Sequence, residues 1–263
     1  MQVTHKPTIL IILDGWGHTD NTVYNAIYSA NKPNWDQIWD TYPHTFISAS
    51  GIDVGLPAAQ MGNSEVGHMN IGSGRVVDQE FTRITRAIEN GSFFKNEKLV
   101  PAFNKAAENN KAVHIIGLLS DGGVHSHEEH IFALMELAAQ CNIKHLYIHG
   151  FLDGRDTPPK SATESIHNTQ LKIKDLGIGQ FASLIGRHYA MDRNKRWERT
   201  KLAYDLITLG KAEYSSADPF IAIDMAYARE ETDEFVRPTA INKPGEAPVT
   251  VNDGDVVVFA NYR

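Results

Sequence analysis

Short apolar runs alternate with segments of helical periodicity along most of the chain. The apolar runs predict strands at residues 8–13, 113–119, 146–149, 181–185 and 256–260, with a further candidate at 46–50. The periodic segments predict helices at residues 33–42, 79–89, 99–109, 131–141, 161–176 and 197–209. This alternation is typical of an α/β protein with a mostly parallel sheet.

Polar clusters directly follow four of the predicted strands. These clusters read SDGGVHSHEEH, GFLDGRDTPP, GRHYAMDRNKRW and NYR. Since the carboxyl edge of a parallel sheet is where ligands bind, we expect the four clusters to lie at one edge. A glycine-rich segment, MGNSEVGHMNIGSGR at residues 61–75, carries neither a helical nor a strand pattern and contains Ser64.

Length and composition narrow the class of protein. The 263 residues are long for one domain and sufficient for two, and we place a boundary near residues 76–77. The net charge of −7 argues against a nucleic-acid partner, and the apolar run at 9–13 is too short to cross a membrane. The single cysteine, Cys141, excludes a disulfide framework, which favours the cytoplasm, and we predict that it is a core residue.

Two residues in the first part of the chain are candidates for chemistry. Asp14 follows the run ILIIL, and a carboxylate at a strand end suits a metal ion, although taken alone this residue favours an Asp-Gly turn. Ser64 has no G-x-S-x-G elbow or phosphate-loop motif around it, so its hydroxyl needs a base or a metal for activation. The alternative is a glycine-rich loop with an incidental serine.

Three histidines stand close together in GVHSHEEH, namely His125, His127 and His130. Their spacing is similar to the metallo-β-lactamase motif H-x-H-x-D-H, with Glu129 in place of the aspartate. A dinuclear zinc site is therefore one alternative, but the repeated β-α units do not suggest the two packed sheets of that fold. The other alternative is one functional histidine, with the remaining two on the first turn of the next helix.

Arginines occur at three successive strand ends. DGRDTPPKSA contains Asp153, Arg155 and Asp156, while the later clusters contribute Arg187, Arg193 and Arg263. The planar guanidinium group matches carboxylate and phosphate, so this repetition predicts a pocket for a small, doubly anionic substrate. Exposed ion pairs are the alternative for any single arginine.

Taken together, the motifs resemble those of the cofactor-independent phosphoglycerate mutases, a branch of the alkaline-phosphatase-like metalloenzymes. The resemblance rests on LDGWG at 13–17, MGNSEVGHMNIGSGRVV at 61–77, LLSDGGVHSH at 118–127, HGFLDGRDTPPKSA at 149–162, GRHYAMDRNKRWER at 186–199 and NYR at 261–263. It implies a partial alkaline-phosphatase-like domain at residues 1–76 and an inserted α/β transferase domain at 77–263. It also implies that the chain is the N-terminal part of a longer protein, because the family's second phosphatase segment would follow Arg263.

The resemblance also assigns roles to individual residues. Asp14 would be a metal ligand, and Ser64 would be both a metal ligand and the nucleophile that becomes phosphoserine. The residues implied to hold phosphoglycerate are His125, Arg155, Asp156, Arg187, Arg193 and Arg263. The complete enzyme would bind two manganese ions, although magnesium or cobalt also suits such oxygen ligands.

The implied function is the interconversion of 3-phosphoglycerate and 2-phosphoglycerate without 2,3-bisphosphoglycerate, by a cytoplasmic monomer. The implied partner is therefore a small-molecule substrate, and neither a nucleic acid nor a membrane. Two alternatives stay open: a metal-dependent phosphatase or other phosphomutase of the same superfamily, and an inactive anion-binding fragment. We expect the 263-residue chain on its own to be inactive.

Overall fold

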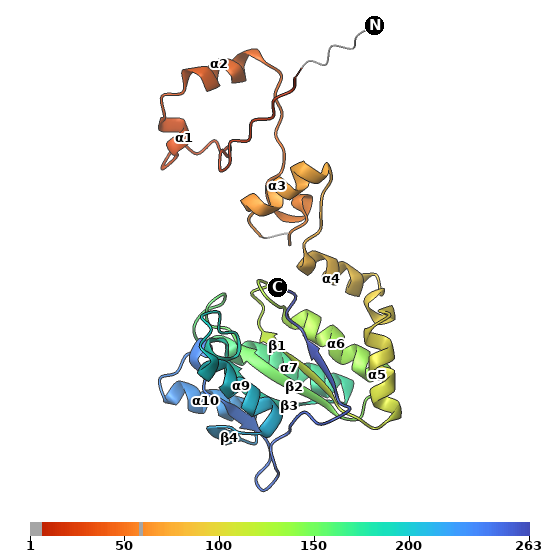
Figure 1. The fold of residues 1–263 in the computed structure, drawn as a ribbon. Coiled ribbons are helices and arrows are strands. Elements are labelled where there is room, and N and C mark those ends of the chain that lie inside the picture. Colours follow the sequence, from red (N-terminus) through yellow and green to blue (C-terminus); the bar gives the residue numbers. More distant parts are fainter. Residues whose placement is uncertain (1–6, 58–59) are drawn as a thin grey trace. The chain divides into compact units, whose positions relative to one another are not determined.

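The computed structural model describes residues 7–57 and 60–263, and the chain divides into two compact units. Unit 1 is Met1–Gln79 and unit 2 is Glu80–Arg263 (Figure 1). The division lies close to the boundary predicted after residue 76. The assignment of the two parts to a phosphatase-like and a transferase domain stays a prediction.

Unit 2 is built on a six-stranded sheet with the strand order β4-β5-β3-β2-β1-β6. Its strands are β1 (Val113–Leu119), β2 (Leu146–Leu152), β3 (Gln180–Gly186), β4 (Tyr214–Ser216), β5 (Thr239–Ile241) and β6 (Val256–Phe259). All neighbours pair in parallel except β5, which runs antiparallel to β3. The predicted α/β class with a mostly parallel sheet is therefore confirmed, and the short strands β4 and β5 are additions.

Unit 2 also contains helices, most of which pack against this sheet (Figure 1). They are α4 (Glu80–Glu89), α5 (Leu99–Glu108), α6 (Glu128–Gln140), α7 (Ala162–Leu176), α8 (Arg187–Ala190), α9 (Trp197–Leu209) and α10 (Pro219–Ala228), with 3₁₀ turns η2 (Phe93–Lys95) and η3 (Asp233–Phe235). The predicted helices of this unit are confirmed, and α8 and α10 are additions. Within the described part of the chain, no helix combines the length and apolar character needed to cross a membrane.

Alternating side chains of the strands form two hydrophobic clusters. On β1, Ile115 and Leu119 join the cluster that includes residues of α5, α6, α7 and α10. Ile116 and Leu118 of the same strand join the second cluster, which includes residues of α9. Both clusters are needed because a parallel sheet is buried on its two faces. Cys141 is a free, buried thiol at the end of α6, as predicted.

Two glycines allow η3 to approach the ends of β2 and β3. A Cβ atom at Gly186 would lie 2.2 Å from the carbonyl oxygen of Glu234. Gly154 has a φ of +66°, and a Cβ there would lie 2.8 Å from the backbone nitrogen of Glu234. Larger residues would push η3 away, so these glycines shape the backbone on which the polar clusters stand.

Unit 1 contains α1 (Ala26–Ser29), α2 (Pro33–Thr41), the 3₁₀ turn η1 (Gly51–Val54) and α3 (Ser64–Ser73). The strand predicted at residues 8–13 is wrong, because this segment is irregular and Ile9, Leu10 and Ile11 are 81%, 72% and 76% exposed. The candidate strand at 46–50 is also irregular. Strands need a hydrogen-bonded neighbour, and none of the described residues pairs with either segment.

Helix α3 occupies most of the glycine-rich segment, where the sequence pattern predicted neither helix nor strand. Asn63 caps its first turn by accepting a hydrogen bond from the backbone N–H of Val66, and Gly74 ends it in the left-handed conformation. The side chain of Asn70 bonds to Val54 O and to the backbone N–H of Val77. These caps and ties outweigh the cost of glycine in a short helix.

A chain of buried polar side chains crosses the sheet of unit 2. His149 Nδ1 lies 2.8 Å from Ser183 Oγ, and His149 Nε2 lies 3.0 Å from His114 Nδ1. His114 Nε2 is 3.4 Å from Asp255 Oδ2.

Two buried histidines of unit 2 have lowered pKa values. Burial, with an additional electrostatic effect of His114, lowers the pKa of His149 from 6.5 to about 3. Burial, with an additional electrostatic effect of His127, lowers the pKa of His130 from 6.5 to about 4.

We expect the free energy of unfolding of unit 2 to fall as the pH is lowered from 7 to about 4.5. His130 and His149 stay neutral in the folded state over this range, whereas the same side chains bind protons in the unfolded chain. Each contributes about 1.4 kcal/mol per pH unit below its unfolded pKa. Urea unfolding followed by circular dichroism measures this slope. His130→Gln removes one of these proton-binding groups and should therefore reduce the slope by about 1.4 kcal/mol per pH unit. An unchanged slope contradicts the prediction.

Candidate functional site

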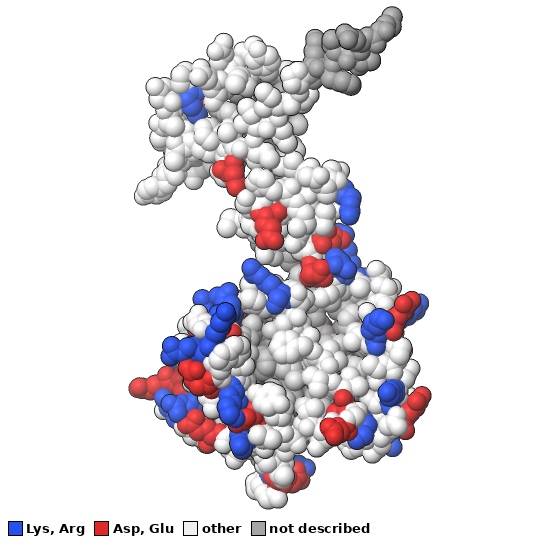
Figure 2. Space-filling model, viewed as in Figure 1, with Lys and Arg blue, Asp and Glu red and all other residues white. Residues whose placement is uncertain are grey.

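The polar clusters of unit 2 meet at the carboxyl edge of its sheet. β1, β2, β3 and β6 are parallel, so the segments that follow them emerge on the same side. The backbone N–H of Tyr262, after β6, donates to the carbonyl oxygen of His125, after β1, at 3.0 Å. Figure 2 shows Lys and Arg side chains, with acidic neighbours, gathered where the loops after β2 and β3 lie in Figure 1. The predicted convergence of these clusters is therefore confirmed.

Arg187 is the central charged group of this edge, and its side chain is only 7% exposed. Its Nη1 donates to Asp153 Oδ1 at 2.6 Å and to Asp156 Oδ2 at 2.5 Å. Burial opposes the charge, but the hydrogen bonds from Arg187 to Asp156 and Asp153 outweigh it and raise the pKa of Arg187. The guanidinium group therefore stays charged, and it is held by carboxylates from the loop after β2.

His125 faces the same ion pairs. Its Nε2 lies 3.7 Å from Asp156 Oδ2. Burial lowers the pKa of His125 below 6.5, and so does the charge of Arg187, while Asp156 opposes the shift. Arg263 and Arg193 lower the same pKa further, so their charges lie close enough to act on His125. The ring is therefore neutral at pH 7 and lies among groups that attract an anion.

Arg155 is placed differently from the other arginines. Its side chain is 55% exposed, and its Nη1 lies 3.8 Å from Glu234 Oε1. The structure thus brings Asp156, Arg187 and His125 into contact, adds Arg193 and Arg263 through their charges, and leaves Arg155 at the exposed margin.

Two further groups, Ser120 and Asp153, lie beneath this site, and both are buried. Sequence reasoning noted Asp153 without giving it a role and did not single out Ser120. Their signal was available, because each residue follows directly on a buried strand.

The three histidines of GVHSHEEH serve separate purposes in the described structure. His127 caps α6, and its Nδ1 accepts from the backbone N–H of Glu129 at 3.2 Å. His130 Nε2 lies 2.9 Å from Thr85 Oγ1. Among the described residues, no three His, Cys, Asp or Glu side chains converge as a ligand set. The β-lactamase-like spacing is therefore accounted for by a helix cap and a helix-to-helix contact.

Unit 1 brings Asp14 and Ser64 together across 50 residues of sequence. Ser64 Oγ donates to Asp14 Oδ2 at 2.7 Å. His68, one helical turn later, places Nδ1 3.2 Å from Ser64 Oγ and 2.8 Å from the carbonyl oxygen of Ser64. Because a carbonyl only accepts, that Nδ1 carries its hydrogen and does not accept the serine proton. Sequence reasoning missed His68, although its i, i+4 spacing from Ser64 was a usable signal.

The Asp14–Ser64 pair has the chemistry of part of a metal site. Both side chains are exposed, and both present oxygen atoms, which suit manganese, magnesium or cobalt. The residues present therefore fit such an ion as two of its ligands. Asp14 also lies in a turn, in which Trp16 N donates to Leu13 O, so the turn is observed and the role of Asp14 as a metal ligand stays a prediction.

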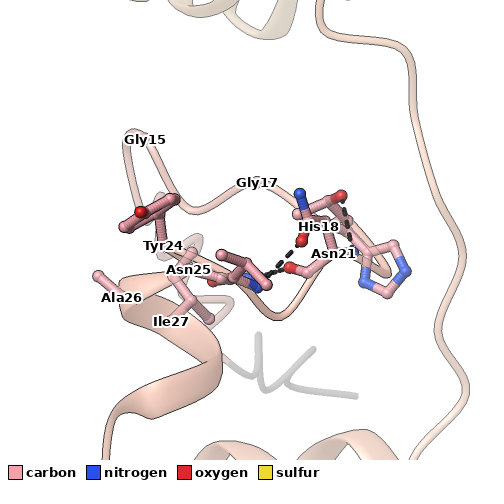
Figure 3. A pocket seen from close by; sticks show the side chains of 10 residues that line it. Gly15, Gly17, His18, Asn21, Tyr24, Asn25, Ala26 and Ile27 are labelled. Atoms are coloured by element: carbon pink, nitrogen blue, oxygen red, sulfur yellow. Dashed lines mark hydrogen bonds between the residues drawn. The ribbon is translucent and has the colours of Figure 1, made fainter.

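A hollow in unit 1 lies along the loop that follows Asp14 (Figure 3). The side chain of Asn25 closes this loop by donating to the carbonyl oxygen of Asn21 at 2.9 Å. Among the described lining residues there is neither a carboxylate nor a Lys or Arg. We therefore assign it no anion or metal chemistry.

Fold and site together define an α/β protein that gathers arginines, a histidine and carboxylates at the carboxyl edge of a parallel sheet. The family model described as BPG-independent PGAM N-terminus (iPGM_N) matches residues 84–263. The chain therefore belongs to this family.

Curated relatives agree with this assignment. The chain is 55% identical over all 263 residues to the 2,3-bisphosphoglycerate-independent phosphoglycerate mutase of Nitrosococcus oceani, and covers 51% of that protein. It is 57% identical over the same length to the enzyme of that name from Pseudomonas entomophila, again covering 51%. The chain thus spans about half the length of the curated relatives that it matches.

A solved structure is also similar. The Leishmania mexicana phosphoglycerate mutase, crystallised at low cobalt concentration, is 30% identical with a TM-score of 0.75. The match covers 96% of this chain and 48% of that one.

We expect His125 to titrate below pH 6.5, as followed by NMR of its Cε1–H signal. Asp156→Asn should lower the pKa further, because it removes the opposing carboxylate, and Arg193→Ala should raise it. Arg237→Ala is the matched control, since Arg237 pairs with Glu213 and should leave the pKa of His125 unchanged. Identical titrations in wild type and both site variants contradict this electrostatic picture.

Proposed function

We propose that this chain supplies the nucleophile and the substrate site of an enzyme that interconverts 3-phosphoglycerate and 2-phosphoglycerate without 2,3-bisphosphoglycerate. The observation that carries the proposal is the set of Asp156, Arg187 and His125 at the carboxyl edge of the sheet, to which Arg193 and Arg263 add positive charge. Membership of the iPGM_N family supports the same conclusion. The proposed substrate is small and anionic, and the proposed location is the cytoplasm.

Ser64 is the proposed nucleophile. Its Oγ attacks the phosphorus of 3-phosphoglycerate, the bond from phosphorus to the oxygen on carbon 3 breaks, and that oxygen takes up a proton as the serine loses one. Ser64 begins α3, so a phosphoryl group on Oγ would lie at the positive end of a helix. The hydroxyl oxygen on carbon 2 then attacks the phosphorus of phosphoserine, the bond from phosphorus to Ser64 Oγ breaks, and Ser64 regains a proton as that hydroxyl loses one, which gives 2-phosphoglycerate.

Asp14 and Ser64 are the proposed ligands of a divalent metal ion, with manganese as the expected metal. When bound, such an ion lowers the pKa of the serine hydroxyl and offsets charge on the phosphoryl oxygens. The hydrogen bond from Ser64 to Asp14 supports this role, because it already directs the hydroxyl toward the carboxylate.

The groups of unit 2 are proposed to hold the glycerate while Ser64 carries the phosphoryl group. Arg187, Arg193, Arg263 and Arg155 would bind its carboxylate and the phosphate through paired N–H groups. Asp156 would contact the glycerate hydroxyls. A neutral His125 has both a donor and an acceptor nitrogen available for the same hydroxyls or for the phosphate.

A protein of the relatives' full length that carries this chain should convert 3-phosphoglycerate to 2-phosphoglycerate when manganese is added and 2,3-bisphosphoglycerate is absent. Ser64→Ala should lower kcat by at least about 10³-fold and abolish phosphoserine at that position by mass spectrometry. Ser73→Ala, at the other end of α3, is the matched control and should retain activity. Release of inorganic phosphate without 2-phosphoglycerate would identify a phosphatase instead.

The 263-residue chain alone should bind 3-phosphoglycerate weakly and show no turnover, because we assign only Asp14 and Ser64 of its described residues to the metal, and two ligands hold a divalent ion weakly. NMR titration with 3-phosphoglycerate measures the binding, and a coupled assay measures turnover. Substantial mutase activity from this chain contradicts the proposal that it acts with further polypeptide.

A further inference from the structure

Asp153 is the most heavily bonded carboxylate at the carboxyl edge of the sheet, and it is only 3% exposed. Its Oδ1 accepts from the backbone N–H groups of Arg155 at 3.1 Å and Asp156 at 2.9 Å, and from Arg187 Nη1 at 2.6 Å. Its Oδ2 accepts from Ser120 Oγ at 2.6 Å. One side chain thus bonds to three of the residues that we assign to the substrate.

These bonds join the ends of three neighbouring strands. Ser120 follows β1, Asp153 follows β2, and Arg187 follows β3. Ser120 is itself oriented, because its Oγ accepts from the backbone N–H of Gly122 at 3.0 Å while donating to Asp153. The carboxylate therefore sets both the direction of the guanidinium group and the course of the loop that carries Arg155 and Asp156.

The charge of Asp153 is maintained in this buried position. Burial raises its pKa, but the hydrogen bonds from Ser120, the backbone of Asp156 and Arg187 outweigh burial and hold the pKa below its usual value. A charged carboxylate beneath Arg187 fixes the guanidinium more strongly than a neutral oxygen would. The small exposed fraction keeps Asp153 itself away from any ligand on the surface of the site.

We propose that Asp153 is a positioning residue of the phosphoglycerate site, which holds Arg187 and the Arg155–Asp156 loop in their binding arrangement without touching the substrate. This inference rests on the proposed function for the identity of the ligand. The contact between Asp153 and Arg187 does not depend on which ligand binds. Ser120 supports the same arrangement by fixing the second oxygen of the carboxylate.

Asp233 provides a matched control within the same unit. It is 1% exposed and accepts from the backbone N–H groups of Ser161 at 2.8 Å and Ala162 at 2.9 Å, and from the hydroxyl of Tyr227 at 2.5 Å. It resembles Asp153 in burial and in its backbone hydrogen bonds, but it bonds to none of the site arginines. A purely structural role predicts similar consequences for the two residues.

The test compares Asp153→Asn and Asp233→Asn in the 263-residue chain. Asparagine keeps the shape and one acceptor oxygen, so the first substitution mainly removes the charge facing Arg187. We expect both variants to be less stable in urea. Only Asp153→Asn should move the Arg187 Nε–Hε NMR signal and weaken 3-phosphoglycerate binding in an NMR titration, by about tenfold or more.

The outcomes separate this inference from the proposed function. If the wild-type chain does not bind 3-phosphoglycerate, the proposed ligand is wrong for this chain, and the Arg187 signal alone decides the role of Asp153. An Arg187 signal that is unchanged in Asp153→Asn, or equal losses of binding in both variants, overturns the positioning role.

A second variant, Ser120→Ala, tests the inference if Asp153→Asn does not fold. Ser120→Ala keeps the carboxylate and its bond to Arg187 but frees Oδ2. It should move the Arg187 signal in the same direction by a smaller amount and weaken binding about threefold. An unmoved Arg187 signal in this folded variant overturns the inference.

Discussion

Parallel pairing of β2 with β1 and β3 is the constraint on which the site of unit 2 depends. Because the three strands run in one direction, Ser120, Asp153 and Arg187 leave the sheet at the same edge. The two hydrophobic clusters on either side of the sheet hold that pairing in place. Burial of apolar side chains on the two faces of the sheet therefore positions the polar groups at its edge. These polar groups are then available to bind a ligand.

Charge at this edge is balanced in a way that suits an anionic ligand. Arg187 is compensated by two carboxylates, whereas Arg193 and Arg263 are exposed and act on a neutral His125. The buried ion pairs therefore define geometry, and Arg193 and Arg263, which have no ion-pair partner in the described part of the chain, supply positive charge. This division is how a chain with a net charge of −7 could present the anion site that we propose.

Unit 1, in contrast to unit 2, buries few apolar residues. Its buried apolar residues in the described structure are Val54, Leu56 and Val66, while the apolar run at residues 9–13 lies exposed. Yet the same unit holds Ser64 against Asp14 with a 2.7 Å hydrogen bond and caps α3 at Asn63. Local hydrogen bonds thus define the serine centre even where little apolar surface is buried.

Much of unit 2 was predictable from the chain alone. Seven-residue apolar runs such as β1 and amphipathic segments such as α7 carry their periodicity in the residues themselves, and polar clusters after strands indicated the site edge. The motifs also identified the family before any contact was known. Short elements such as β4 and β5 were not predicted, because three residues are too few to show the alternation of a strand.

The tertiary structure decided what depends on partners distant in sequence. The run at residues 9–13 has a strand pattern but no strand, because β structure forms only when a neighbouring backbone accepts its hydrogen bonds. The segment around Ser64 became a helix through its caps and through the ties of Asn70, despite its glycines. The position of Asp153 after a strand was visible in the sequence, but the proposed positioning role was not, since it follows from the donors that folding places around the carboxylate. Sequence therefore determined the longer elements of unit 2 and the candidate residues, and only three-dimensional proximity determined which residues lie together.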